Sequence, residues 1–336
     1  PISVTFVGDT SLSRRPMDRV AVPLRQMGAQ VGGQGGRCLP PVTVCGGGLR
    51  GIDYILPMAS AQVKSAILLA GLRAEGNTRV QEPGPSRDHT ERMLGMFGAA
   101  IQRNPGWVSI EGGQRLQGGR AIKVPGDMSS ASFIAAAAAL VEGSDVEIAG
   151  VGLNPTRTGL LEVMERMGAA VECEPEPSGP TAKDDEPSGR VRVRFAGRLR
   201  GCSIGGNLLV RTLDEFPVVC ILAACAEGET VIRDAQELRV KESDRIAEMA
   251  RVLGRMGVEV EEFPDGLSIR GGGGLTSARI DCRGDHRVAM AAAVAGLVSG
   301  GMEIENAQAI STSYPGFVDD MRRLGGTMEM RCEGER

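Results

Sequence analysis

Five stretches of this chain share one pattern: RQMGAQV (Arg25–Val31), GMFGAAI (Gly95–Ile101), ERMGAAV (Glu165–Val171), GRMGVEV (Gly254–Val260) and RRLGGTM (Arg322–Met328). Each reads as the tail of a helix, then a glycine, then a small or β-branched residue. The five glycines are separated by 70, 70, 89 and 68 residues. Self-similarity at a nearly fixed spacing indicates a fold assembled from repeated supersecondary units.

The one long spacing has a visible cause in the sequence. It contains Glu174–Arg190 (EPEPSGPTAKDDEPSGR), whose proline, serine, glycine and acidic residues predict an inserted surface loop. The start of the chain differs from the rest. The first repeat glycine is Gly28, so only 28 residues are present up to it, where the spacing of 70 predicts a full unit. The chain also begins at Pro1 rather than at a methionine. We expect that it starts inside a unit and lacks an N-terminal segment.

Each repeat also contains a long run of alanine, leucine and valine that ends in glycine. Such a run, apolar on almost every side, predicts a buried helix with a glycine stop. A short β-branched run follows each one and predicts a strand, and alternating residues after the repeat glycine predict further strands. One unit is thus a buried helix, a strand, an amphipathic helix and more strands, which makes the fold α/β. The four runs end at Gly76, Gly143, Gly228 and Gly300.

Composition narrows the classes of protein. A length of 336 residues favours two domains, and no apolar run reaches the roughly 18 residues that span a membrane. The eight cysteines form no CxxC motif and no cluster with histidine, which favours a reducing cytosol over disulfides or a zinc site. A net charge of −4 and 3% aromatic residues argue against a nucleic-acid partner.

Basic residues decorate the predicted starts of four amphipathic helices. Arginine is normally disfavoured there, because the helix macrodipole is positive at its N-terminus. Free backbone N–H groups together with arginine or lysine instead make a strong anion site. Ordinary solvated charge explains any one of the four equally well, but four in the same repeat phase favour a polyanionic ligand. The segments are Ser11–Met17, Ser86–Thr90, Asn154–Gly159 and Val240–Arg245.

The densest of these segments is LRVKESDR, residues 238–245. Arg245 could pair with a carboxylate or phosphate of a substrate, Lys241 could neutralise a second anionic group, and Glu242 could move a proton. The alternative is an exposed capping segment, because Ser243 or Asp244 would cap the helix well.

The buried helices also begin with polar groups. Their first residues include Ser60-Ala61-Gln62, Asp127-Met128-Ser129-Ser130, Asp214 just before Phe216-Pro217, and Asp285-His286-Arg287. An acid followed by proline is an ordinary helix start, but His286 is one of only two histidines in the chain. If all these N-termini converge, they would enclose a cleft between two domains built from the repeats.

Together these residues resemble one family, the 5-enolpyruvylshikimate-3-phosphate synthases. The resemblance covers essentially the whole chain, and LRVKESDR together with DHR is its most specific part. MASAQVKS and SRDHT resemble the bacterial branch that includes glyphosate-tolerant forms. The matching segments are GDTSLSRRPM, MASAQVKS, SRDHTERM, VPGDMSSASF, NPTRTG, DEFP, LRVKESDR, DHRVAM and STSYPGF.

The resemblance implies the inside-out α/β fold of enolpyruvyl transferases, with two domains of βαβαββ units, buried helices and an incomplete first domain. Residues 1–124 would form the shikimate-phosphate side and residues 125–336 the phosphoenolpyruvate side. It implies transfer of the enolpyruvyl group of phosphoenolpyruvate to the 5-hydroxyl of shikimate 3-phosphate, with release of phosphate through a tetrahedral intermediate. This is the step of aromatic amino acid biosynthesis, in the shikimate pathway, that glyphosate targets. We expect a cytoplasmic monomer that needs no cofactor or metal and binds neither nucleic acid nor membrane.

The resemblance also implies roles for individual residues. Ser60, Gln62 and Arg87 match contacts of shikimate 3-phosphate, with Ser60 and Arg87 near its phosphate. Asp214 and Lys241 match groups on the ring hydroxyls, and Asp214 would assist loss of the 5-hydroxyl proton. The remaining matches are Glu242, which would move a proton at the phosphoenolpyruvate methylene, Arg245 and Arg287, which would clamp phosphoenolpyruvate, and His286 beside them.

Departures from the family pattern leave alternatives open. The Gly-Asp-Lys-Ser and Gly-Asn-x-Gly-Thr motifs, with a lysine and arginines of the site, are absent, and Thr312 stands where many relatives have a lysine. The chain alone could therefore be an inactive fragment of this enzyme. A second alternative is the sister enzyme UDP-N-acetylglucosamine enolpyruvyl transferase, which LRVKESDR and MASAQVKS disfavour. A non-catalytic anion-binding protein is the third, and it would not need Asp214, Glu242 and the DHR cluster together.

Overall fold

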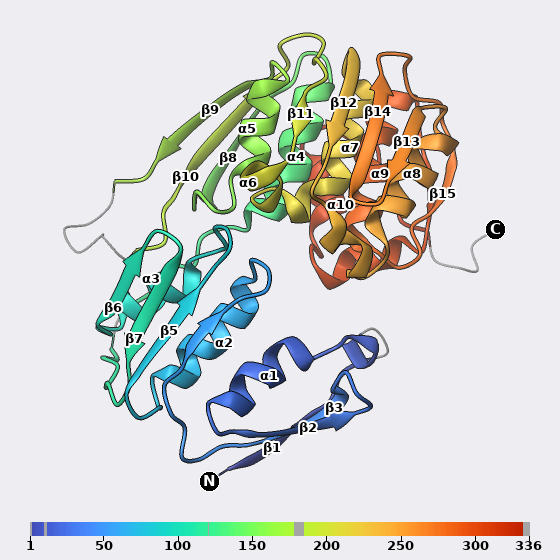
Figure 1. Ribbon diagram of the computed structural model, residues 1–336. Helices are drawn as coiled ribbons and strands as arrows, with labels where there is room; N and C mark the ends of the chain where they lie inside the picture. Colours follow the sequence, from blue (N-terminus) through green and yellow to red (C-terminus); the bar gives the residue numbers. More distant parts are fainter. Residues whose placement is uncertain (1, 10–11, 120, 178–184, 332–336) are drawn as a thin grey trace. The chain divides into compact units, whose positions relative to one another are not determined.

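The computed structural model describes residues 2–9, 12–119, 121–177 and 185–331 (Figure 1). The chain forms two compact units. Unit 1 comprises Pro1–Lys123 together with Ser178–Glu186, of which Asp185 and Glu186 are described at the end of the second segment. Unit 2 comprises Val124–Pro177 and Pro187–Arg336.

Unit 1 contains two sheets and three α-helices among its described residues. In the first sheet β3 pairs antiparallel with β1 and β2, and α1 packs on β2. The second has the order β4-β5-β7-β6, and α2 packs against β5 and β7. The elements are β1 (Ser3–Phe6), a 3-10 turn η1 (Leu12–Arg14), α1 (Asp18–Gln26), β2 (Gln30–Gln34), β3 (Leu39–Cys45), β4 (Asp53–Ile55), α2 (Ala61–Gly71), β5 (Asn77–Gln81), α3 (His89–Met96), β6 (Ile101–Asn104) and β7 (Trp107–Glu111).

Unit 2 contains sheets of three, four and two strands, in the orders β8-β10-β9, β11-β12-β14-β13 and β15-β16. Its elements are α4 (Met128–Leu140), β8 (Asp145–Gly152), α5 (Gly159–Arg166), β9 (Ala170–Pro175), β10 (Ser188–Arg194), β11 (Ser203–Ile204), α6 (Gly206–Val210), η2 (Leu213–Glu215), α7 (Phe216–Cys225), β12 (Gly228–Ile232), η3 (Gln236–Val240), α8 (Arg245–Arg255), β13 (Glu259–Phe263), β14 (Gly266–Gly271), β15 (Arg279–Asp281), α9 (His286–Ser299), β16 (Glu303–Glu305), η4 (Ala307–Thr312) and α10 (Phe317–Arg323).

The same connectivity recurs along the chain, as the repeat predicted. A short strand leads into a buried helix, the next strand pairs parallel with the first, and an amphipathic helix then leads into an antiparallel hairpin. The parallel pairs are β4–β5, β11–β12 and β15–β16, and the hairpins are β6–β7, β9–β10 and β13–β14. Each repeat is therefore a βαβαββ unit or a part of one.

The helices lie inside and the sheets outside in unit 2. The alanine-rich helices α4, α7 and α9 pack against one another, and Figure 1 shows them beneath the sheets. All of α7 is buried except Cys225, whereas β10 alternates buried and exposed residues, so one face of its sheet is solvated. Helices that are apolar on all sides must be covered completely, and this arrangement covers them. None of the described helices is long and apolar enough to cross a membrane.

The repeat glycines have a backbone reason to recur. Gly28, Gly98, Gly168, Gly257 and Gly325 all have φ between +82° and +103°. Each follows the last turn of an amphipathic helix, where the chain adopts the left-handed conformation, and the first four lead into a strand. A residue with a Cβ atom is strained in this conformation, so the sequence pattern marks the helix ends reliably.

Two predicted boundaries are wrong. Of the four buried helices, only α9 ends directly at its glycine, Gly300, whereas α2 already ends at Gly71. Gly76 and Gly143 lie in the turns that lead to the next strand, and Gly228 is already the first residue of β12. The predicted loop Glu174–Arg190 is also shorter at both ends, because Pro175 pairs with Gly189 within the β9–β10 hairpin. Residues 178–184 of that loop lie outside the described part of the chain.

Candidate functional site

Arg245 is the centre of a charged cluster in unit 2. It opens α8, whose cap is Asp244, because the Asp244 carboxylate accepts a hydrogen bond of 3.1 Å from the Ala247 N–H. The Arg245 side chain is only 1% exposed, so its charge needs partners inside the protein. It finds Asp285, with Nε 3.0 Å from Oδ2, and Glu242, with Nη2 2.8 Å from Oε2.

Asp285 connects the starts of two helices. Its Oδ1 caps α9 by accepting hydrogen bonds from the N–H groups of Arg287 and Val288, at 2.9 and 3.4 Å. Its Oδ2 accepts from Ser243 Oγ at 2.9 Å and from Arg245. Burial alone raises the pKa of Asp285, but the Arg245 charge and these hydrogen bonds outweigh it and hold the pKa below its usual value. Asp285 is therefore ionised at neutral pH.

Asp214 is surrounded by three arginines. Arg157 Nη1 lies 3.2 Å from Asp214 Oδ2, Arg245 Nη1 lies 3.9 Å from Oδ1, and Arg287 Nη2 lies 4.0 Å from Oδ2. Arg287 also donates a hydrogen bond of 3.0 Å to the Asp214 backbone carbonyl. The DEFP, LRVKESDR and DHR segments, separate in the sequence, thus come together in one place.

The other residues of unit 2 singled out in the sequence make mostly local contacts. The Lys241 ammonium is 3.1 Å from Glu237, and the Glu242 side chain is 30% exposed while it pairs with Arg245. Burial first, and then the Arg287 charge, hold the pKa of His286 below its usual value, so its imidazole is uncharged at pH 7. Thr312 is exposed and donates its hydroxyl hydrogen bond to Ala309 within η4.

The cluster combines two chemical capacities. Arg245 and Arg287 present cationic guanidinium groups at the starts of α8 and α9, which favours an anion such as a carboxylate or phosphate. Asp214 and Glu242 are carboxylates beside these cations, and carboxylates in that setting can accept and return protons. None of the described residues groups three or more histidine, cysteine, aspartate or glutamate side chains in a way that could hold a metal ion.

The predicted residues of unit 1 lie at the starts of α2 and α3. Ser60 caps α2 through a long hydrogen bond of 3.5 Å from the Val63 N–H, and Gln62 is exposed in the first turn. Arg87 stands two residues before α3 and is half-buried. A hydrogen bond of 2.7 Å between the Ser65 and Thr90 hydroxyls joins these two helix starts.

Beneath these helix starts lies a buried ion triad that sequence analysis missed. The Lys64 ammonium, 1% exposed, is 2.8 Å from Glu82 Oε1 and 2.7 Å from Glu91 Oε1. It ties α2 to the end of β5 and to α3, on both sides of Arg87. Lys64 lies in the matching segment MASAQVKS, but only its burial distinguishes it from a solvated lysine.

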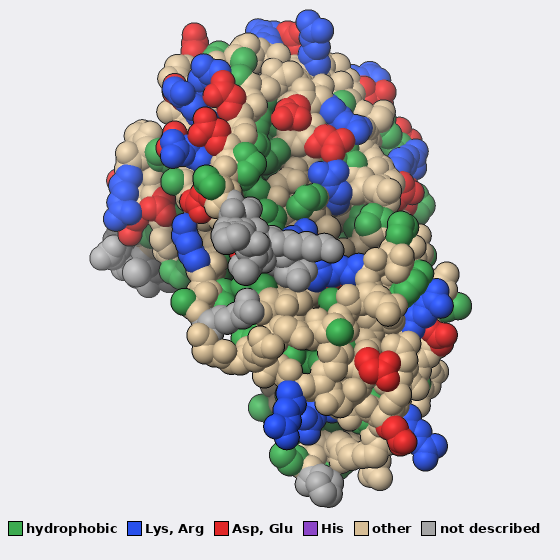
Figure 2. Space-filling view, turned by 90° about the vertical axis from the view of Figure 1, so that its left-hand side faces the viewer, with side chains coloured by type: hydrophobic (Ala, Val, Ile, Leu, Met, Phe, Trp, Pro, Cys, Tyr) green, Lys and Arg blue, Asp and Glu red, His purple; other side chains and the backbone are tan. Residues whose placement is uncertain are grey.

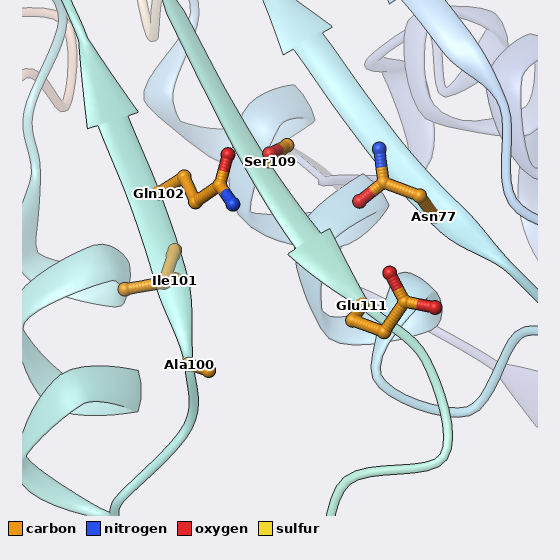
Figure 3. A pocket seen from close by; sticks show the side chains of 6 residues that line it. All are labelled: Asn77, Ala100, Ile101, Gln102, Ser109 and Glu111. Carbon is orange, nitrogen blue, oxygen red and sulfur yellow. The ribbon is translucent and has the colours of Figure 1, made fainter.

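The other surfaces of the protein are less suited to binding an anion. A shallow pocket on the β4-β5-β7-β6 sheet is lined by Asn77, Ala100, Ile101, Gln102, Ser109 and Glu111 (Figure 3). It has no basic residue, so it does not suit the anionic ligand expected here. Figure 2 shows acidic and basic side chains interspersed on unit 2, in keeping with pairs such as Arg192–Asp145 at 2.7 Å.

Known proteins resemble the whole chain. The family model described as EPSP synthase (3-phosphoshikimate 1-carboxyvinyltransferase) matches residues 1–321. A Pelotomaculum thermopropionicum protein named 3-phosphoshikimate 1-carboxyvinyltransferase is 50% identical over 325 residues, which are 96% of this chain and 74% of the relative.

Solved structures confirm the predicted fold. EPSP synthase from Acinetobacter baumannii superposes with a TM-score of 0.85 at 45% identity, over 97% of this chain and 74% of that one. The enolpyruvyl transferase NikO from Streptomyces tendae, at 18% identity and a TM-score of 0.77, shares the fold, over 97% of this chain and 73% of that one.

Proposed function

Because this chain belongs to the EPSP synthase family, the 3-phosphoshikimate 1-carboxyvinyltransferases, we propose that it transfers the enolpyruvyl group of phosphoenolpyruvate to shikimate 3-phosphate with residues of the clusters described above. The observation that carries the assignment of residues is the group of Asp214, Glu242, Arg245 and Arg287 in unit 2. Both substrates are anions, and this group places carboxylates that can move protons beside cations that can bind anions.

Each residue of unit 2 has a proposed step. Arg245 and Arg287 bind phosphoenolpyruvate, with the uncharged His286 beside them. Asp214 accepts the proton of the 5-hydroxyl as that oxygen attacks C2 of phosphoenolpyruvate, and Glu242 supplies a proton to its methylene carbon. Glu242 then takes a proton back from the methyl group, the double bond re-forms and phosphate leaves with the electrons of its bond to carbon. Lys241 binds a ring hydroxyl of shikimate 3-phosphate.

Unit 1 is proposed to bind the phosphate of shikimate 3-phosphate through Ser60 and Arg87, with Gln62 on the ring. The positive ends of the α2 and α3 helix dipoles favour an anion there, and Arg87 adds a charge. The proposed substrate domains are residues 1–124 and 125–336, and the two units support this division except that Val124 groups with unit 2 and Ser178–Glu186 with unit 1.

Replacing Arg87 with alanine is expected to weaken binding of shikimate 3-phosphate by roughly 1.5–3 kcal/mol, because a charge-assisted hydrogen bond to phosphate is lost. Phosphoenolpyruvate should bind almost as in the parent. Titration calorimetry of the full-length protein with each substrate measures both affinities. Arg287→Met should give the opposite pattern, with phosphoenolpyruvate affected and shikimate 3-phosphate spared.

Arg92→Ala is the matched control for Arg87. Arg92 lies on α3, five residues after Arg87, is 20% exposed and pairs at 2.8 Å with Asp88, the residue before the helix. It should bind both substrates like the parent. Equal losses for the two substrates in Arg87→Ala, or a loss in Arg92→Ala as large as in Arg87→Ala, would contradict the assignment of Arg87.

We also propose a cytoplasmic monomer. The cysteines support a reducing compartment, because the seven described ones are free thiols and burial raises the pKa of Cys225 to about 12. Sedimentation velocity, run with and without reductant, checks the proposal. One species of monomer mass in both conditions is the expected result, and a disulfide-linked dimer would contradict it.

A further inference from the structure

Sequence analysis placed Arg157 of unit 2 only within a candidate anion-binding segment, Asn154–Gly159, and the family resemblance assigned it no role of its own. It lies in the turn before α5, and its side chain is 13% exposed. The turn is built tightly, because the buried Asn154 accepts hydrogen bonds of 2.9 and 2.7 Å from the Thr156 N–H and hydroxyl. The Asn154 carbonyl also accepts from the Arg157 N–H at 2.8 Å. The backbone that carries Arg157 is therefore fixed.

The Arg157 guanidinium joins two other segments of the chain. Nη1 donates to Asp214 Oδ2 at 3.2 Å, and Nη2 donates to Asp127 Oδ1, also at 3.2 Å. Nη2 also donates to the hydroxyl of Ser129 in the first turn of α4. Two nitrogens of one planar group thus serve three acceptors, whereas an ammonium would have to reach all three from a single nitrogen.

Behind this fork lies a buried acid. Ser129 donates its hydroxyl hydrogen bond to Glu215, which is 2% exposed and directly follows Asp214 in the chain. Burial raises the pKa of Glu215, although the Arg157 charge opposes this effect. Arg157 and Ser129 therefore hold the short segment Asp214-Glu215 from one side, while Arg287 holds the Asp214 carbonyl from the other.

We propose that Arg157 is a positioning residue for Asp214, so that it fixes the carboxylate that receives the 5-hydroxyl proton. The inference rests on the proposed role of Asp214. Three basic groups face that carboxylate: Arg157 from the turn before α5, Arg245 from α8 and Arg287 from α9. The Arg157 contact, at 3.2 Å, is the shortest and has hydrogen-bond length, whereas 3.9 and 4.0 Å are distances of ion pairs only. Glu215 and Asp127 are the acids of the same network.

The decisive variant is Arg157→Met, assayed in the full-length protein with both substrates. We expect kcat to fall about 10²-fold, because a misplaced reacting group loses about that much rate, while both KM values change by less than about threefold. The acidic limb of the pH profile of kcat should move to higher pH. Loss of a neighbouring cation favours the protonated form of a carboxyl group, so more alkaline conditions are then needed to ionise it.

Arg157→Lys separates charge from geometry. Lysine keeps the positive charge but replaces the planar two-nitrogen fork by one nitrogen on a flexible stem, so kcat should fall about tenfold while the acidic limb stays in place. If the methionine variant does not fold, as judged by circular dichroism, the lysine variant decides alone. A lysine variant with the kcat of the parent would overturn the proposal.

Arg251→Met is the matched control. Arg251 is 22% exposed, lies in the same unit and makes a hydrogen-bonded pair with Glu248 at 2.7 Å. Its guanidinium also donates a hydrogen bond to the Asp281 carbonyl. Replacing Arg251 removes an ion pair comparable to the one between Arg157 and Asp214. We expect the kcat and the pH profile of this variant to equal those of the parent. A pH profile shifted as in Arg157→Met would show a general effect of lost charge and would overturn the inference.

A double variant distinguishes failure of this inference from failure of the proposed function. If Arg157 acts through Asp214, then Arg157→Met with Asp214→Asn should have about the kcat of Asp214→Asn alone. Losses that multiply would overturn the positioning role while leaving the proposed function of Asp214 intact. A parent-like kcat in Asp214→Asn itself would overturn both.

Discussion

Replacing Glu242 with glutamine is expected to lower kcat roughly 10²–10⁴-fold and to leave both KM values within a few-fold of the parent. This is the usual share of general acid–base catalysis in a rate enhancement. The amide can still accept a hydrogen bond from Arg245, whose Nη2 is 2.8 Å from the carboxylate, so the clamp on phosphoenolpyruvate should persist. What is lost is the exchangeable proton, which is needed only in the transition state. Steady-state assays of phosphate release by the full-length protein measure the effect.

Glu262→Gln serves as the control for Glu242. Glu262 also pairs with an arginine, Arg239, at 2.9 Å in the same unit, and it is 42% exposed. Its substitution should leave kcat and KM unchanged. If Glu242→Gln instead keeps its kcat and changes KM alone, Glu242 only holds Arg245 in place, and Asp214 becomes the better candidate for both proton transfers.

Replacing Lys64 with methionine is expected to reduce the free energy of unfolding of unit 1 by about 3–5 kcal/mol. The substitution keeps the length of the side chain but leaves two carboxylates, Glu82 and Glu91, without the cation between them. Uncompensated buried charge costs this much in proteins. Few other groups can compensate for the lost cation, because Glu91 Oε2 is already buried without a hydrogen-bond partner among the described residues. Urea unfolding followed by tryptophan fluorescence measures the loss.

The probe for this experiment is selective. Trp107 is the one tryptophan of the chain and lies in β7, so its fluorescence reports on unit 1. Arg92→Met, which breaks a half-exposed pair within α3, should cost less than about 1 kcal/mol. Adding Glu82→Gln and Glu91→Gln to Lys64→Met should recover part of the loss. An unfolding midpoint for Lys64→Met equal to that of Arg92→Met would show that the triad contributes little to stability.

The fold could be predicted from the sequence because its signals are local. A glycine that must adopt positive φ after each amphipathic helix, and helices apolar on every side, both follow from the backbone and from burial of neighbouring residues. The helix ends could not be placed as well, because α2 stops at Gly71, where tertiary contacts rather than the later Gly76 decide. A Cβ atom at Gly71 would lie 2.8 Å from the Thr78 hydroxyl, so the helix and β5 pack directly there.

The candidate site could be predicted in part, where its residues are close together in the sequence. Lys241 and Glu242 lie just before α8, which Arg245 opens, so the proximity of the three residues follows from their closeness in the sequence. The contact of Arg157 with Asp214 joins residues 57 positions apart, and the Lys64 triad joins three segments, so no local pattern reveals either. NPTRTG and DMSS were recognised as polar helix starts, but the contacts of Arg157 with Asp127, Ser129 and Asp214 follow only from the tertiary packing.

Asp285 sets a limit on how this protein can be altered by evolution or by design. One carboxylate fixes the first turn of α9, which carries Arg287, and at the same time orients Arg245 at the start of α8. A substitution of Asp285 would therefore affect the positions of Arg245 and Arg287 at the same time. A lineage that tunes ligand preference must change residues other than this shared support, such as Lys241, and leave Asp285 as it is. Library designs that vary such positions and hold Asp285 constant should accordingly retain more folded variants.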